Sequence, residues 1–151
     1  MTDYFGDGTK SRINICDIDG TIATHPQRGH HDYAKVGTDL PVTKIIELVE
    51  YLDIILPISE TVFVTGRPEK CREDTEAWLK EHVPTFLNTD TPLLMRKDGD
   101  YRGDDIVKRE IYEDYIEPYC EVMYVIDDRN RVVKMWRELG LTVLQVADGE
   151  F

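Results

Sequence analysis

Short β-rich runs alternate with helix-like stretches along most of this chain. The runs expected to be strands cover residues 12–17, 61–65, 92–95, 121–126 and 141–146. The stretches expected to be helices cover residues 42–56, 68–82, 104–117 and 130–139. Strands that alternate with helices typically form a parallel sheet with helices on both faces. The sequence therefore predicts a Rossmann-like, doubly wound α/β fold with a parallel sheet of about five strands.

The length of 151 residues suits one domain. We expect residues 1–11 to be a flexible lead-in and residues 12–151 to form a single domain. Residues 21–41 mix His, Pro, Gly and charged side chains, which predicts a long loop. The segments before and after the second strand leave no spare length for another domain. We therefore expect a minimal cap or none over a site at the sheet edge.

The chain is strongly acidic, with 18 Lys and Arg against 30 Asp and Glu and a formal net charge of −12. This charge argues against non-specific coating of nucleic acid, but it is compatible with a small positive pocket for one phosphate. No apolar stretch is long enough to span a membrane, and no signal peptide is visible. Three separated cysteines without a Cys-x-x-Cys pair predict reduced thiols and a cytoplasmic location.

Polar clusters follow three of the expected strands, at the edge where ligands bind in such sheets. After the first strand come Asp17, Asp19, Gly20 and Thr21. Asp17 is a candidate nucleophile or metal ligand, and Asp19 a candidate general acid and base. Gly20 permits a sharp turn, and Thr21 is placed to bond within the turn or to a phosphate. An acidic, solvated turn without catalytic function is the alternative.

The second cluster is Thr65-Gly66-Arg67, just before Pro68 and an expected helix. A hydroxyl, free amides and a helix N-terminus would form an anion site, to which Arg67 could add a bidentate contact. By itself, the pattern fits an ordinary strand-to-helix turn better.

The third cluster is Asp127-Asp128, after an apolar run. Two carboxylates at a buried strand end repel each other unless a cation neutralises them, and Mg²⁺ fits this need. A helix cap is the alternative. Lys108 and Arg109 compete as the cation near the start of the 104–117 helix, and spacing alone does not choose Lys108.

These clusters resemble the four motifs of the haloacid dehalogenase (HAD) phosphatase superfamily, in matching order and position. The motifs are DIDGT at 17–21, TGR at 65–67, Lys108 and the Asp127-Asp128 pair. Segments 99–111 and 126–151 further resemble the 3′-phosphatase domains of phage polynucleotide kinase-phosphatases. A phage-encoded protein of this family would act in the host cytoplasm.

The resemblance implies roles for individual residues. Asp17 would be the nucleophile and Asp19 the general acid and base, with its carbonyl also on Mg²⁺. Asp127 and Asp128 would complete the metal site, with Asp128 as the direct ligand. Thr65, with Gly66 beside it, and Lys108 would bind the phosphoryl group. The remaining implied roles are substrate contacts from Arg28 and Arg67, and orientation of Lys108 or Arg28 by Asp104.

The resemblance implies a Mg²⁺-dependent phosphomonoesterase for 3′-phosphorylated nucleic acid ends, acting through an aspartyl-phosphate. No phosphate-binding P-loop motif is present, so kinase activity is not expected. One alternative is a phosphatase of small nucleotides or other phosphorylated metabolites. Another is a non-enzymatic, phospho-accepting receiver module. The sequence indicates neither the sugar preference nor the oligomeric state.

Overall fold

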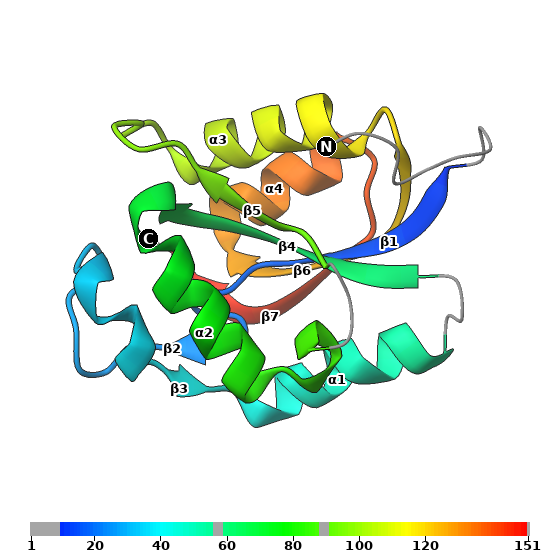
Figure 1. The fold of residues 1–151 in the computed structure, drawn as a ribbon. Helices are drawn as coiled ribbons and strands as arrows, with labels where there is room; N and C mark the ends of the chain where they lie inside the picture. Colours follow the sequence, from blue (N-terminus) through cyan, green and yellow to red (C-terminus); the bar gives the residue numbers. More distant parts are fainter. Residues whose placement is uncertain (1–9, 56–58, 88–90, 151) are drawn as a thin grey trace.

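A five-stranded parallel sheet forms the centre of the chain (Figure 1). The structure, a computed structural model, describes residues 10–55, 59–87 and 91–150. The strands lie in the order β5-β4-β1-β6-β7, and each neighbouring pair is parallel. Their bounds are β1 Ser11–Cys16, β4 Ser59–Pro68, β5 Leu93–Arg96, β6 Cys120–Arg129 and β7 Val143–Gly149. The predicted Rossmann-like α/β fold is thus confirmed.

Two helices cover each face of the sheet (Figure 1). Helices α1 (Thr43–Ile55) and α2 (Arg72–His82) lie on one face, and α3 (Asp104–Ile111) and α4 (Asn130–Glu138) lie on the other. Gly140 follows α4 with φ +82°, the left-handed conformation that commonly ends a helix. None of the helices in the described ranges is both long and apolar enough to cross a membrane.

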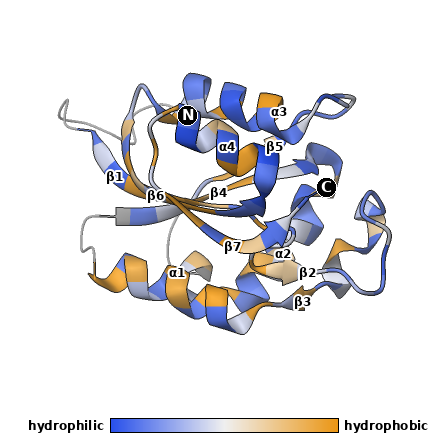
Figure 2. Ribbon diagram, turned by 180° about the vertical axis from the view of Figure 1, so that it is seen from behind, coloured by the Kyte–Doolittle hydropathy of each residue, from blue (hydrophilic) through white to orange (hydrophobic). Residues whose placement is uncertain are grey.

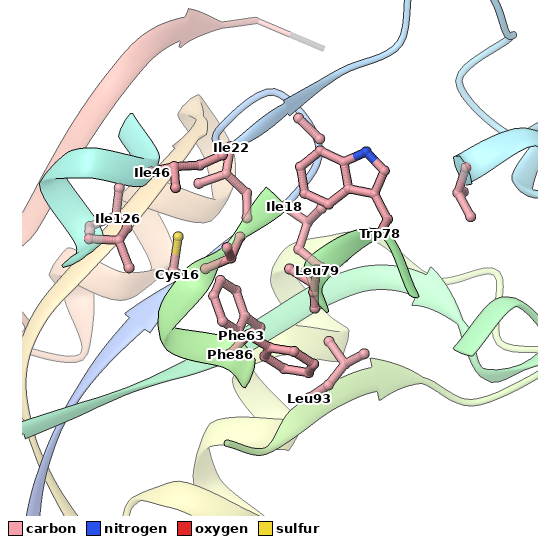
Figure 3. Packing of buried hydrophobic residues seen from close by; sticks show 14 of the residues in the cluster. Cys16, Ile18, Ile22, Ile46, Phe63, Trp78, Leu79, Phe86, Leu93 and Ile126 are labelled. Atoms are coloured by element: carbon pink, nitrogen blue, oxygen red, sulfur yellow. The ribbon is translucent and has the colours of Figure 1, made fainter. Parts of the chain in front are cut away.

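The two faces of the strands pack into separate cores because side chains alternate along a strand. Phe63 packs with residues of α1 and α2, whereas Val62 and Val64 beside it pack with residues of α3 and α4. The rings of Phe63 and Phe86 meet edge to face, with centroids 5.8 Å apart (Figure 3). Figure 2 shows hydrophobic residues along the central strands and hydrophilic loops beyond the sheet.

The segment 21–41 is more ordered than the predicted long loop. It contains the two-residue strands β2 (Ala23–Thr24) and β3 (Leu40–Pro41), which pair antiparallel, and a 3₁₀ helix (η1, Tyr33–Thr38) between them. A strand of two residues is too short to show the alternation of apolar and polar residues by which strands are recognised in a sequence. This small hairpin is the only cap-like insertion within the described residues of this segment.

Other boundaries differ from the prediction. Strand β4 continues through Gly66 to Pro68, and a 3₁₀ turn (η2, Glu69–Cys71) precedes α2. The helix predicted to begin at Pro68 therefore begins four residues later, at Arg72. Helix α3 continues as a π-helical turn (η4, Tyr112–Ile116). A further 3₁₀ turn (η3) covers Pro84–Leu87.

Some predicted features fall outside the described residues. These are most of the lead-in at residues 1–11 and the helix end at Leu56 and Pro57. The three cysteines are free and buried, in agreement with the expected reduced thiols.

The sheet order creates a switch point at β1. From β1 the chain builds outward through β4 and β5, then crosses back to build β6 and β7 on the other side. Ligands of doubly wound sheets bind at the carboxyl ends of the strands at such a point. The ends of β1 and β6 are therefore the expected location of the site.

Candidate active site

Asp17 follows β1, and Asp127 and Asp128 lie near the end of β6, the adjacent strand. The register pairs Cys16 with Ile126, and the Asp17 amide donates to the Ile126 carbonyl at 2.9 Å. One carboxylate oxygen from each of the three aspartates lies within 4.8 Å of the others. All three residues are buried, so the strand register itself creates a concentrated negative site.

The turn after β1 depends on Gly20. Its φ of +84° is a left-handed conformation that side chains disfavour. A Cβ atom there would lie 2.2 Å from Oδ2 of Asp128. The Thr21 hydroxyl lies 3.2 Å from Oδ2 of Asp17 and 3.4 Å from Oδ1 of Asp128. Its single proton can serve only one of these carboxylates at a time, and the phosphate contact of Thr21 stays a prediction.

Lys108 is the cation of this site, which settles its competition with Arg109. Its Nζ donates to Oδ1 of Asp17 at 2.7 Å and to Oδ2 of Asp127 at 2.9 Å. Burial works to lower the pKa of Lys108, but the charges of Asp127 and Asp17 outweigh it and raise that pKa. Arg109 instead faces Glu138 at the surface, 3.5 Å away.

The Asp127-Asp128 pair divides into two different environments. Asp127 accepts hydrogen bonds from Lys108, from the Trp136 indole at 3.2 Å, and from the amides of Asp128 and Arg129. Among the described residues, the Asp128 side chain accepts only the long hydrogen bond from Thr21, at 3.4 Å. Burial and the charge of Asp127 raise the pKa of Asp128 to about 6. Asp128 is therefore the carboxylate with oxygen atoms available to a cation.

The donor set suits Mg²⁺. Asp17, Asp127 and Asp128 supply only oxygen atoms, and Lys108 is the one cation bonded to them in the described chain. Hard divalent cations prefer such oxygen ligands, and Mg²⁺ needs only one or two carboxylates from the protein. The geometry supports Asp17 and Asp128 as ligands, with Asp127 as the anchor of Lys108.

A second group of charges surrounds Asp19, and we call Arg28, Arg67, Asp19 and Asp39 the arginine–aspartate cluster. Arg67 donates to both carboxylate oxygens of Asp19, at 2.9 and 2.8 Å, and Arg28 donates to Oδ1 at 2.7 Å. Burial works to raise the pKa of Asp19, but the hydrogen bond and charge of Arg67, with the charge of Arg28, lower it overall. Asp19 is therefore an ionised, firmly oriented carboxylate.

Asp39 completes this cluster, and sequence reasoning missed it. Its carboxylate accepts from Arg28 at 2.6 and 2.7 Å and from Arg67 at 2.7 Å, and its carbonyl accepts from the Trp78 indole. The side chains of both arginines are fully buried. The sequence predicts substrate contacts for Arg28 and Arg67, but in the structure both are bound to aspartates. We therefore interpret both as positioning residues for Asp19.

Replacing Asp39 with asparagine is expected to lower kcat about a hundredfold with little change in KM, because misplacement of a catalytic group by about 1 Å costs that much. Asp32 lies in the same segment, is partly exposed and forms an ion pair with Lys35, so it provides the matched control Asp32→Asn. Steady-state kinetics and thermal melting measure both variants. An unchanged kcat for Asp39→Asn would show that Asp19 needs no such support.

The Thr65-Gly66-Arg67 segment lies at the site but not at a helix N-terminus, because α2 begins only at Arg72. The Thr65 hydroxyl is buried and accepts a hydrogen bond from the Arg67 amide at 3.2 Å. Gly66 is packed against Asp104, since a Cβ atom at Gly66 would lie 2.7 Å from Oδ1 of Asp104. The predicted helix-dipole contribution is therefore wrong, whereas the phosphate contact of Thr65 stays a prediction.

Asp104 has partners other than those predicted. It binds Arg96 and Arg129 instead of Lys108 or Arg28, and it does not cap α3, whose N-cap is Gly103. Arg96 also donates to the carbonyl of Gly66 at 2.8 Å. Asp104 thus connects Arg96, at the end of β5, with Arg129, the residue after Asp128. Through Arg96 it is also linked to Gly66 in β4.

The carboxylates of Asp17, Asp19, Asp127 and Asp128 line a small pocket of about 20 Å³. His30, Tyr33 and Arg129 also line it, and the sequence did not single out Arg129. His25 and His30 contact each other at 3.4 Å, but the three aspartates are the only potential metal-binding group of three among the described residues.

The fold and the site together define the class of this protein: it is a HAD-type phosphatase domain. Residues 11–151 match the family described as "Polynucleotide kinase PNKP phosphatase domain", and the chain belongs to that family. The matched range contains Asp17, Lys108 and Asp128.

Individual relatives agree with this assignment. A bifunctional polynucleotide kinase/RNA ligase described from Autographa californica nuclear polyhedrosis virus is 33% identical over 141 residues, 89% of this chain and 19% of that protein. A chain in a Pnkp1/Rnl/Hen1 RNA repair complex is 32% identical with a TM-score of 0.85, over 96% of this chain and 45% of that one.

A class C acid phosphatase from Bacillus anthracis shares the fold alone, at 13% identity and a TM-score of 0.68, over 95% of this chain and 70% of that one. This chain thus spans less than half of the viral relative and of the repair-complex chain.

Proposed function

We propose that this chain removes the terminal phosphate from 3′-phosphorylated DNA or RNA ends by Mg²⁺-dependent hydrolysis, without kinase activity. The observation that carries the proposal is the convergence of Asp17, Lys108 and Asp128 in one buried pocket of a polynucleotide-phosphatase family member. The receiver-like alternative is not retained, because the chain belongs to a phosphatase family.

In the proposed reaction the Asp17 carboxylate attacks phosphorus, and the bond from phosphorus to the 3′ oxygen breaks. The leaving oxygen takes a proton from Asp19, and the phosphoryl group remains on Asp17 as an acyl phosphate. Asp19 then removes a proton from water, which attacks phosphorus and releases inorganic phosphate while freeing Asp17.

The surroundings of Asp19 suit the second step more directly than the first. Its lowered pKa keeps it ionised in the substrate-free protein, ready to accept a proton from water. For the first step it must carry a proton, so a partial release from Arg67 and Arg28 accompanies substrate binding in this proposal. Lys108 and Thr65 would contact the phosphoryl oxygens. Mg²⁺ bound by Asp17, Asp128 and the Asp19 carbonyl would neutralise charge on those oxygens.

The second candidate is a phosphatase of small nucleotides or other phosphorylated metabolites. The net charge of −12 and the small catalytic pocket favour it, because both suit a compact substrate. Residues 10–55, 59–87 and 91–150 form no large cap that could close over such a substrate, which favours the polynucleotide instead.

Phosphate release distinguishes these functions when 3′-phosphorylated oligonucleotide, its 5′-phosphorylated counterpart and 3′-mononucleotide are compared with Mg²⁺ and with EDTA. We expect release from the 3′-phosphorylated oligonucleotide with Mg²⁺, little from the 5′ counterpart, and none with EDTA. Faster turnover of the mononucleotide would favour the second candidate. Equal turnover of both oligonucleotides would contradict the 3′ assignment.

A further inference from the structure

A second, larger cavity of about 880 Å³ adjoins the catalytic pocket. The two share four lining residues, His30, Tyr33, Asp104 and Arg129. We call this cavity the outer groove; the turn η2, the loop 97–103 and the first turn of α4 form its other walls. The loop 97–103 and the η1 segment project beyond the same end of the sheet (Figure 1).

The outer groove is positive in a chain that is otherwise acidic. Five Lys and Arg residues line it against three Asp residues, whereas the whole chain carries −12. Lys70 is exposed, and no ion pair joins its ammonium to another residue in the described ranges. Arg131 is half exposed, with its closest carboxylate, Asp105, 3.5 Å away. These two cations remain accessible to an anion in solution.

The other cations of the groove have structural roles. Arg102 binds Asp100 and Glu110 at 2.7 Å, and Arg96 donates to the carbonyls of Asp100 and Arg102 at 3.0 and 2.8 Å. These bonds fix the loop 97–103. Tyr101 lies within this loop and lines the groove, and it is 94% exposed. An aromatic ring on a fixed loop is a suitable platform for stacking a base.

We propose that the outer groove binds the nucleotides that precede the phosphorylated 3′ end of a single strand, with backbone phosphates on Lys70 and Arg131 and a base on Tyr101. This assignment rests on the proposed function. The cavity volume lies within the roughly 300–1,000 Å³ of typical ligand sites, so nucleotide-sized groups fit. Because the catalytic pocket is much smaller, most contacts that distinguish a polynucleotide from a bare phosphate ester would lie in this groove.

The test compares 3′-phosphorylated oligothymidylates of increasing length with p-nitrophenyl phosphate. For the parent, kcat/KM rises with oligonucleotide length. Each variant is characterised by its kcat/KM on the oligonucleotide divided by its kcat/KM on p-nitrophenyl phosphate. Tyr101→Ala lowers this ratio by about fivefold or more, which corresponds to the smallest effects measured when one stacked base loses its aromatic partner. Lys70→Gln and Arg131→Gln each flatten the plot of log kcat/KM against log salt by about 0.7.

Two exposed residues on other elements provide matched controls, Tyr51→Ala on α1 and Lys80→Gln on α2. Both should retain the length dependence of the parent. If the groove variants also retain it, or if the parent shows no length dependence, the groove assignment is wrong while the 3′-phosphatase function stands. If the parent fails to prefer 3′-phosphorylated ends, the proposed function fails, and the groove assignment fails with it.

Discussion

Replacing Asp17 with asparagine abolishes phosphate release, a loss of at least about ten-thousandfold, in line with the removal of other enzyme nucleophiles. The amide cannot form an acyl phosphate, so neither step of the proposed reaction proceeds. The substitution preserves shape, because an amide oxygen can face Lys108 and its nitrogen can face the Thr21 hydroxyl. Phosphate release with a 3′-phosphorylated oligonucleotide and Mg²⁺ measures the effect.

The fold of the Asp17→Asn variant should be intact. Burial and the charges of Asp127 and Asp128 raise the pKa of Asp17, with Lys108 opposing them, so its ionised form destabilises the folded state above the usual carboxyl pKa. A neutral asparagine removes this cost, and we expect an unchanged or higher Tm in EDTA. The control Asp74→Asn, at an exposed position of α2, should retain parental activity. Parental turnover by Asp17→Asn would show that the nucleophile lies elsewhere.

The sheet and the convergence of Asp17 with Asp127 and Asp128 could be predicted from the sequence. Each acidic cluster directly follows a short β-rich run, and parallel strands bring such positions to one edge. Lys108 was harder to predict, because a lysine near the start of a helix usually faces water. One signal was available: Val107 and Ile111 are apolar and buried, and Lys108 lies on the same face of α3.

The arginine–aspartate cluster was beyond sequence reasoning. Asp39 is eleven residues from Arg28, within a segment whose two-residue strands and 3₁₀ helix leave no periodic pattern. The start of α2 was misplaced because Pro68 suits both a first helical turn and the end of an extended segment, and here it has ψ 153°. Tertiary contacts, which a single sequence does not display, decided both cases.

Replacing Lys108 with methionine is expected to lower the free energy of unfolding by about 3–5 kcal/mol at pH 8 in EDTA, the usual cost of removing one partner from a buried ion pair. The change leaves the carboxylates of Asp17, Asp127 and Asp128 buried without their bonded cation. Phosphatase activity should also be lost, because the ammonium is the proposed contact of the transferred phosphoryl group. Urea unfolding followed by circular dichroism measures the stability difference.

The pH dependence separates this electrostatic cause from a packing defect. The pKa values of Asp17 and Asp128 are already raised in the parent, and loss of the Lys108 charge raises them further. A carboxyl group with a raised pKa in the folded state binds more protons there than in the unfolded chain, so stability increases as the pH falls toward the unfolded value near 4. The deficit of Lys108→Met should therefore shrink between pH 8 and pH 5. The control Lys134→Met, at an exposed position of α4, should show no deficit at either pH. A deficit that is the same at both pH values would mean that Lys108 contributes by packing and does not neutralise the carboxylates.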